Sequence, residues 1–178
     1  MKTIIKEYNL FTFDELTQKA KDKARENYNK GSDYPFLPDD MNERLHELLE
    51  ENGIVDTNDT SKPGTKPTPV LYSLSYSQGD GAMFEGVFEW NGYTVTVKHQ
   101  GHYYHYNSKT IDIVDEEGNE PETDEPLNAF NEVYVNICKE LESYGYAEIA
   151  HEDSEESFAE LCEANEYTFL ADGTIMND

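Results

Sequence analysis

Basic residues are scarce in this chain, and they are almost absent from its last third. The sequence has 13 lysine and arginine residues against 38 aspartate and glutamate residues, which gives a formal net charge of −25. From residue 110 onward, Lys139 is the only basic residue beside 21 acidic ones. Such a segment repels nucleic acid and attracts basic surfaces, so we expect no direct binding of nucleic acid.

Cysteine is also rare, and long apolar runs are missing. Cys138 and Cys162 are the two cysteines; they lack the spacing of a metal site, and we expect both to be small core residues. Without a signal peptide or an apolar run that approaches a membrane span, we expect a cytoplasmic protein with reduced thiols and no membrane partner. The motifs Gly-x-Ser-x-Gly and His-Glu-x-x-His and a Cys-His pairing are missing too, which favours a protein that is not an enzyme.

The stretch from 71 to 114 carries the clearest structural pattern. Asn91-Gly92 separates two runs of alternating polarity, and this dipeptide is typical of a two-residue type I′ hairpin turn. The alternation in 72–77 predicts another strand. The loop 78–81, with two glycines, would connect this strand to the hairpin. The turn predicts an apolar face and a polar face with these pairs: Trp90 with Tyr93, Phe88 with Val95 and Phe84 with His99, and on the other face Glu89 with Thr94 and Glu85 with Lys98.

Helical patterns lie on both sides of this stretch in the sequence. We therefore expect an α+β fold, in which an antiparallel β meander of three to four strands (about 70–114) is covered by N-terminal and C-terminal helices. The chain would form a single domain, 1–178, with flexible loops near 56–69 and 115–126. The expected flanking elements are an edge strand at 3–10, helices from Thr12 to Gly31, from Met41 to Gly53, from Phe130 to about Gly145 and after Ser154, and a hairpin at 167–175. Thr12 and Glu15 predict a capping box at the first helix, Gly53 predicts a Schellman ending of the second, and Ser154 marks the start of the last.

Three histidines recur at intervals of three residues, at His99, His102 and His105. With Asp80 they form a candidate site for a divalent metal, since imidazole and carboxylate ligands suit zinc, iron or manganese. On a continuous strand His102 would point away from the other two, so convergence requires a bulge or turn at Gln100-Gly101. The alternative is an aromatic strand with hydrogen-bonding histidines, because tyrosines lie between them.

The acidic residues themselves are the second candidate site. A net charge of magnitude ~2–8 is enough to keep a small domain soluble, so the excess here calls for more than solubility. Carboxylates on helices and loops can reproduce the spacing of duplex phosphates, one charge per ~1.7 Å of helix axis. The candidate partner-binding residues are Glu116, Glu117, Glu120, Glu122, Asp124, Glu125, Glu152, Asp153, Glu155 and Glu156.

Four motifs resemble those of small acidic proteins that are encoded by phages, prophages and plasmids. They are FDEL-x(3)-AKDKA, YSLSYSQGDGAMFEG, HQGHYYHYNS and ELCEANEYTFLADGTI, and they span most of the chain. The resemblance implies a mobile-element origin and no particular catalytic residues. By analogy of charge, the chain is similar to anti-CRISPR and antirestriction proteins that act as DNA mimics.

The leading hypothesis is therefore an inhibitor of a host defence protein in the bacterial cytoplasm. Its partner would be a basic nucleic-acid-binding protein such as a CRISPR effector or a restriction enzyme, and no cofactor would be needed. One alternative is an enzyme that binds a metal or small ligand at the histidine cluster. The other is an antitoxin-like regulator of a basic partner.

Overall fold

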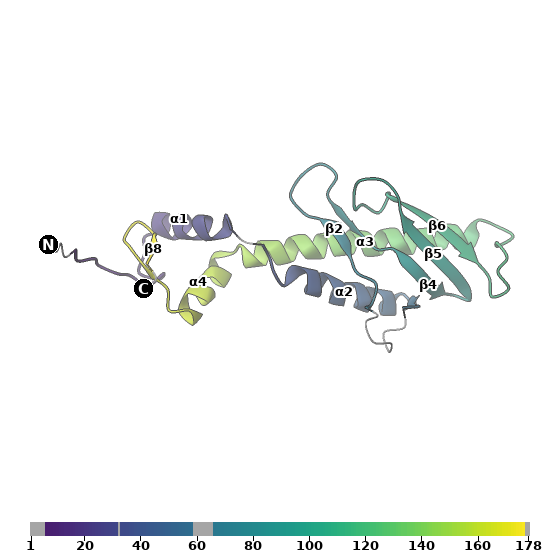
Figure 1. Ribbon diagram of the computed structural model, residues 1–178, viewed down its shortest axis with the longest axis horizontal. Coiled ribbons are helices and arrows are strands. Elements are labelled where there is room, and N and C mark those ends of the chain that lie inside the picture. The colour runs from purple at the N-terminus through teal and green to yellow at the C-terminus, as the bar shows by residue number, and fades with distance from the viewer. Residues whose placement is uncertain (1–5, 32, 59–65, 177–178) are drawn as a thin grey trace, which may run out of the picture. The chain divides into compact units, whose positions relative to one another are not determined.

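The computed structural model describes residues 6–31, 33–58 and 66–176 (Figure 1). It confirms the α+β class, with helices and antiparallel sheets. The chain divides into two compact units, unit 1 (Met1–Tyr34 and Glu148–Asp178) and unit 2 (Pro35–Ala147). The interpretation of the chain as one domain stays a prediction.

The elements are α1 (Gln18–Asn29), α2 (Leu37–Glu51), β1 (Val55–Asp56), β2 (Leu71–Ser73), β3 (Gly81–Met83), β4 (Gly86–Trp90), β5 (Tyr93–His99), β6 (Lys109–Val114), α3 (Glu125–Glu152), α4 (Glu155–Ala164), β7 (Thr168–Phe169) and β8 (Ile175–Met176).

The main sheet of unit 2 has the strand order β1-β4-β5-β6, and its last three strands form an antiparallel meander. The predicted hairpin register is confirmed, since Trp90 pairs with Tyr93 and Phe88 with Val95. Asn91 and Gly92 have φ values of 49° and 81°, as a type I′ turn requires. The strand expected from 72 to 77 forms only in its first residues: β2 ends at Ser73 and pairs with β3 in a separate two-stranded sheet.

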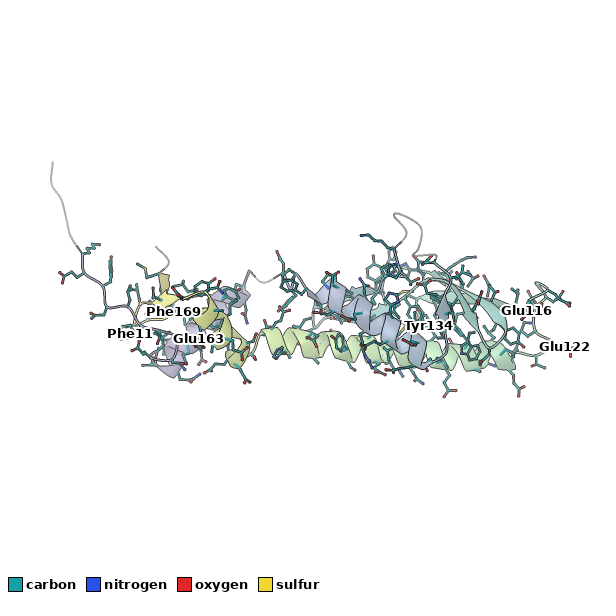
Figure 2. All side chains as sticks on the ribbon, turned by 90° about the horizontal axis from the view of Figure 1, so that it is seen from below. Phe11, Glu116, Glu122, Tyr134, Glu163 and Phe169 are labelled. Carbon is teal, nitrogen blue, oxygen red and sulfur yellow. The ribbon has the colours of Figure 1, made fainter. Side chains whose placement is uncertain are left out.

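The outer two pairs of the predicted hairpin do not form, because β4 begins only at Gly86. Phe84 is fully buried instead, and its ring lies 4.7 Å from that of Tyr134 between ring centroids. The hydroxyl of Tyr134 donates to the backbone oxygen of Phe84 at 3.0 Å (Figure 2 labels Tyr134). Glu85 accepts a hydrogen bond from the backbone N–H of His99 at 2.9 Å. Phe84 therefore packs on α3 instead of pairing with His99, whereas Glu85 contacts the backbone of β5 instead of the side chain of Lys98.

One face of the main sheet is buried and the other is exposed, as expected for an antiparallel sheet covered on one side. Phe88 and Val95 are fully buried, whereas Glu89 is exposed. Trp90 meets Phe130 of α3 edge to face, with ring centroids 5.4 Å apart. Burial of each such large side chain contributes about 1.5–3 kcal/mol, so the sheet and α3 supply much of the stability of unit 2.

Helix α3 continues past Gly145, where the sequence predicted its end, to Glu152. A Cβ atom at Gly145 would lie 2.4 Å from Cδ1 of Leu74 and 2.9 Å from Sδ of Met41. The glycine is therefore a position of close packing against α2 and the loop after β2. A glycine inside a helix costs only about 1 kcal/mol relative to alanine. The close packing of Met41 and Leu74 at this position therefore outweighs the poor helix propensity of glycine.

Unit 1 is built around α1, α4 and the hairpin β7–β8. Its core holds Phe13, Ala20, Ala24, Phe158 and Phe169, with the rings of Phe13 and Phe158 packed edge to face at 5.1 Å. The C-terminal hairpin is confirmed by the pairing of β7 with β8. Residues 6–10 form no strand, and residues 3–5 of the expected edge strand lie outside the described residues.

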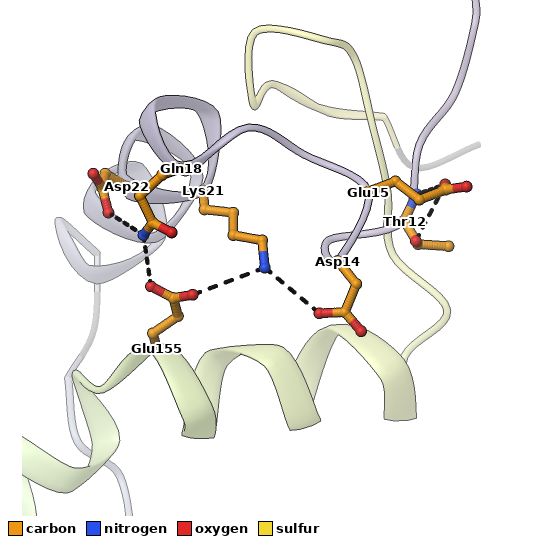
Figure 3. A network of polar contacts seen from close by, with 7 residues as sticks. All are labelled: Thr12, Asp14, Glu15, Gln18, Lys21, Asp22 and Glu155. Carbon is orange, nitrogen blue, oxygen red and sulfur yellow. Dashed lines mark hydrogen bonds and ion pairs between the residues drawn. The ribbon is translucent and has the colours of Figure 1, made fainter.

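The first helix starts later than its capping box predicts. The N–H of Thr12 does donate to Oε2 of Glu15 at 2.9 Å (Figure 3), but this contact closes a single turn. Thr17 is the residue before the helix. Phe13 and Leu16 are drawn into the core as members of that turn, so the apolar spacing that suggested a helix serves burial in an irregular segment.

Two helices end in the same C-terminal motif, but with different residues in the left-handed position. At the end of α2, the N–H of Ile54 donates to Leu49 O and that of Gly53 to Glu50 O, which confirms the predicted Schellman ending. At the end of α4, the corresponding bonds run from Tyr167 to Cys162 and from Glu166 to Glu163. Here the residue with positive φ, 53°, is a glutamate.

Replacing Glu166 by glycine is therefore expected to stabilise unit 1. An L-residue in this conformation costs ~1–2 kcal/mol, and the greater freedom of glycine in the unfolded chain returns part of that, so we expect a gain of about 0.5–1 kcal/mol. Urea unfolding checks the prediction. The matched reverse change, Gly53→Ala in α2, should destabilise by a similar amount, and a loss of stability in Glu166→Gly would contradict the reasoning.

The stretch expected to be a flexible loop at 56–69 is anchored at both of its described flanks. Thr68 is only 1 % exposed, and its N–H donates to the Asp56 carboxylate at 2.8 Å. The side-chain amide of Asn58 donates to the hydroxyl of Thr68 at 2.9 Å. These contacts tie the two flanks to one another, and residues 59–65 lie outside the described part of the chain.

Candidate partner-binding surface

Six of the ten candidate acidic residues lie together in unit 2, after β6 and at the first residue of α3. Figure 2 shows Glu116 and Glu122 at the same end of this unit. All six are exposed, and among the described residues none of them forms an ion pair. We call this set the acidic loop: Glu116, Glu117, Glu120, Glu122, Asp124 and Glu125.

Asp115 gives the acidic loop its shape. Its carboxylate accepts hydrogen bonds from the N–H groups of Asn119 and Glu117 at 2.8 and 2.9 Å. Its own N–H donates to Asn119 O at 2.9 Å. The hydrogen bonds from Asn119, more than any other contact, hold the pKa of Asp115 below its usual range. The backbone of the turn is thus satisfied locally, which leaves the carboxylates beside it in water.

Two cations of unit 2, Arg44 and Lys98, form ion pairs with carboxylates outside the acidic loop. Arg44 of α2 forms a salt bridge with Glu47 at 2.7 Å and another with Glu140 of α3. The hydrogen bonds with Glu47 and Glu140 raise the pKa of Arg44. Lys98 pairs with Asp112 across β5 and β6 at 3.6 Å. The negative potential of the acidic loop is therefore not neutralised by these groups.

The other four candidates, Glu152, Asp153, Glu155 and Glu156, lie in unit 1 where α3 gives way to α4. The hydroxyl of Tyr34 donates to both carboxylate oxygens of Asp153, at 3.0 and 3.1 Å. Glu155 accepts from the side-chain amide of Gln18 at 2.8 Å and pairs with Lys21 at 3.8 Å. Glu152 is half-buried and Glu156 is exposed. The ten residues are thus divided between two units, and two of these four serve contacts inside unit 1.

The structure does not bring the histidine cluster and Asp80 together as a metal site. Nε2 of His99 contacts the backbone oxygen of Tyr103 at 3.2 Å, and Nδ1 of His105 accepts from the N–H of Asn107 at 3.2 Å. His102 is exposed. Within the described residues, no three histidine, cysteine, aspartate or glutamate side chains are placed to hold a metal ion together.

Asp80 has a different role, which the sequence reasoning missed. Its Oδ2 accepts from the N–H of Ser75 at 2.7 Å and of Ser77 at 2.9 Å, and from the Tyr146 hydroxyl at 2.6 Å. Its Oδ1 accepts from the hydroxyls of Ser73, Ser75 and Ser77, each at 3.1 Å. We call this arrangement the Asp80 hub. The signal in the sequence was the serine at every second position from 73 to 77. The same alternation also predicts a strand, so the contacts with Asp80 were missed.

Burial works to raise the pKa of Asp80, but the hydrogen bonds from Tyr146, Ser77 and Ser75 outweigh it. The result is a pKa well below the usual range of an aspartate. Burial and the bond to the Asp80 carboxylate also raise the pKa of Tyr146 to about 12. At neutral pH the pair is therefore a carboxylate that accepts from a neutral phenol, which anchors the loop after β2 on α3.

Both glycines beside Asp80 allow a second loop to pack closely. A Cβ atom at Gly79 would lie 2.6 Å from the ring of Tyr103, and one at Gly81 would lie 2.9 Å from the backbone oxygen of Tyr104. Gly79 also has the expected positive φ, 98°, whereas Gly81 needs to be glycine only because of the close approach. Tyr76 and Tyr103 stay 73 % and 60 % exposed on the two loops.

No protein-family model, curated protein or solved structure matches the chain. No helix among the described residues is both long enough and apolar enough to cross a membrane.

Proposed function

We propose that this chain is a phage-encoded or mobile-element-encoded inhibitor of a host nucleic-acid-binding defence protein, of the anti-CRISPR or antirestriction kind. It acts in the cytoplasm of the bacterial host cell, and it binds the basic protein rather than nucleic acid. The observation that carries the proposal is the acidic loop, which has six exposed carboxylates within ten residues, none of them in an ion pair among the described residues.

Electrostatics explains how such a loop can replace DNA. A groove that binds a duplex holds lysine and arginine side chains at the spacing of phosphates, about one charge per 1.7 Å of axis. Carboxylates that enter this groove release the counterions held there and are steered towards it over long range. Binding driven in this way weakens as the salt concentration rises, because ions released into concentrated salt gain less entropy than ions released into dilute salt.

Reversing four charges of the acidic loop should weaken partner binding by at least about tenfold, the equivalent of ~1.4 kcal/mol. The variant carries Glu116→Lys, Glu117→Lys, Glu120→Lys and Glu122→Lys. The partner is first recovered from a bacterial lysate on the tagged protein, eluted by a salt gradient and identified by mass spectrometry. Its affinity for each variant is then measured by calorimetry.

The matched control reverses four exposed carboxylates of unit 2 that lie outside the acidic loop: Glu43, Glu50, Glu89 and Glu132. It changes the net charge by the same amount and should retain most of the affinity. Equal losses in both variants would mean that binding follows net charge and not the loop. Unchanged affinity in the loop variant, or a partner whose retention does not depend on salt, would contradict the proposal.

A further inference from the structure

Unit 1 contains a groove of about 590 Å³ between the turn at residues 12–14 and α4. Phe13, Ala159, Cys162 and Tyr167 give it an apolar floor. Figure 2 labels Glu163, which lies on the rim of the groove. None of the described residues that line it is basic, and its charged members are Asp14, Glu156, Glu160, Glu163 and Glu166.

Four of the rim carboxylates have no side-chain partner in the described part of the chain. Among the described residues, no hydrogen bond or ion pair engages the side chain of Glu156, Glu160, Glu163 or Glu166. Glu163 and Glu166 also lie at the C-terminal end of α4, where the helix dipole favours a cation and disfavours an anion. The rim therefore places negative charge that no described cation neutralises beside an apolar surface.

The chain itself shows how a lysine fits this chemistry. Nζ of Lys21 lies 5.0 Å from the centroid of the Phe13 ring. It also pairs with the carboxylates of Asp14 at 3.6 Å and Glu155 at 3.8 Å (Figure 3). The Lys21 side chain is only 17 % exposed. Phe13 and Asp14 also line the groove, whereas Lys21 does not. Two residues that bind the chain's own lysine are thus part of the groove as well.

We propose that this groove binds a lysine-bearing or arginine-bearing segment of a partner protein. The aliphatic stems of such side chains lie on the floor formed by Phe13, Cys162 and Tyr167, and their charged heads reach the carboxylates of the rim. Pockets of ~300–1,000 Å³ hold whole small molecules, so the groove has room for more than one side chain. This inference concerns unit 1 alone and does not depend on the acidic loop.

A fluorescently labelled helical peptide of leucine and lysine residues is the probe. Its affinity for the full chain is measured by anisotropy at about 0.15 M salt, where long-range attraction between exposed charges is screened beyond ~8 Å. The triple variant Glu160→Gln, Glu163→Gln and Glu166→Gln should bind the peptide at least about tenfold more weakly, because charge-assisted contacts are lost. A matched variant of three exposed carboxylates in unit 2, Glu43→Gln, Glu50→Gln and Glu132→Gln, should bind it as the unmodified chain does, because these residues belong neither to the rim nor to the acidic loop.

The single change Glu166→Gly separates binding from folding. It is expected to raise the melting temperature and yet to weaken peptide binding by about threefold, since a rim charge is removed. Three results would overturn the proposal: equal losses in the rim variant and the matched variant of unit 2, undiminished affinity in the rim variant, or equally tight binding of a peptide with serine in place of lysine. The rim variant leaves the acidic loop unchanged, and the fourfold Glu→Lys variant leaves the rim unchanged, so failure of this inference is distinguishable from failure of the proposed inhibition.

Discussion

Replacing Gly173 by alanine is expected to lower the free energy of unfolding of unit 1 by about 3–5 kcal/mol. The added Cβ would lie 2.2 Å from the backbone oxygen of Ala20 in α1, far inside van der Waals contact. That oxygen belongs to helical backbone, so it cannot rotate away as the end of a side chain could. Gly173 also has φ of 85°, a region that alanine adopts only at a cost.

Gly118 provides the control for this prediction. Its φ of 86° matches that of Gly173, but no atom lies within 4 Å of where its Cβ would be. Gly118→Ala in unit 2 should therefore cost only the backbone term, about 0.5–1 kcal/mol once the greater freedom of glycine in the unfolded chain is counted, as for Gly53→Ala. Thermal unfolding, together with hydrogen exchange of the α1 amides, measures both variants. Similar losses in the two would show that the close approach of the β7–β8 turn to α1 has no energetic weight.

The elements that could be predicted from the sequence are those with short-range causes. Asn91-Gly92 determined the hairpin register, and Gly53 determined the end of α2 through its left-handed conformation. Ser154 was correctly predicted to cap α4, and its hydroxyl accepts from the N–H of Ser157 at 3.1 Å. Each of these signals acts within a few residues, so no knowledge of tertiary structure was needed.

Two of the wrong predictions have causes that residue spacing does not reveal. Gly145 looks like a helix end in the sequence, but it is required where Met41 and Leu74 pack against α3. The serines up to Ser77 alternate as in a strand, but they converge on Asp80. Periodicity cannot distinguish a side chain that alternates between faces of a sheet from one that folds back on a carboxylate.

The candidate site was predictable to the extent that charge runs stay in water. The acidic loop lies where the composition placed it, since so many carboxylates in so few residues cannot be buried. Asp153 and Glu155 are bound by Tyr34 and Gln18, which lie more than a hundred residues away in the sequence. The groove of unit 1 was missed, although two local signals point to it: glutamates in the last turn of a helix, and Glu166 in a position that favours glycine.

The Asp80 hub leads to the second large effect. Asp80→Ala should destabilise unit 2 by about 2–4 kcal/mol, because six donors lose a charged acceptor at once. Hydrogen bonds to charged groups are worth ~1.5–3 kcal/mol each, and exposure to solvent reduces this value for several of the six. Asp80→Asn keeps the shape but turns an amide NH₂ towards donors, so it should cost nearly as much. The matched control is Ser77→Ala, which removes one neutral hydroxyl from the hub and should cost about 0.5–1.5 kcal/mol.

The pH dependence distinguishes a charged hub from a merely well-packed loop. The folded-state pKa of Asp80 lies below the ordinary value of ~3.9, so its stabilisation is complete above that value and is lost as pH falls through the folded pKa. The difference in free energy of unfolding between the unmodified protein and Asp80→Asn should therefore shrink as the pH is lowered from about 5 towards 2, since the amide does not titrate. Urea unfolding across this range measures the difference, with the other carboxylates titrating equally in both proteins. Two parallel curves would mean that the Asp80 charge does not stabilise the loop, and its six contacts would then count as packing alone.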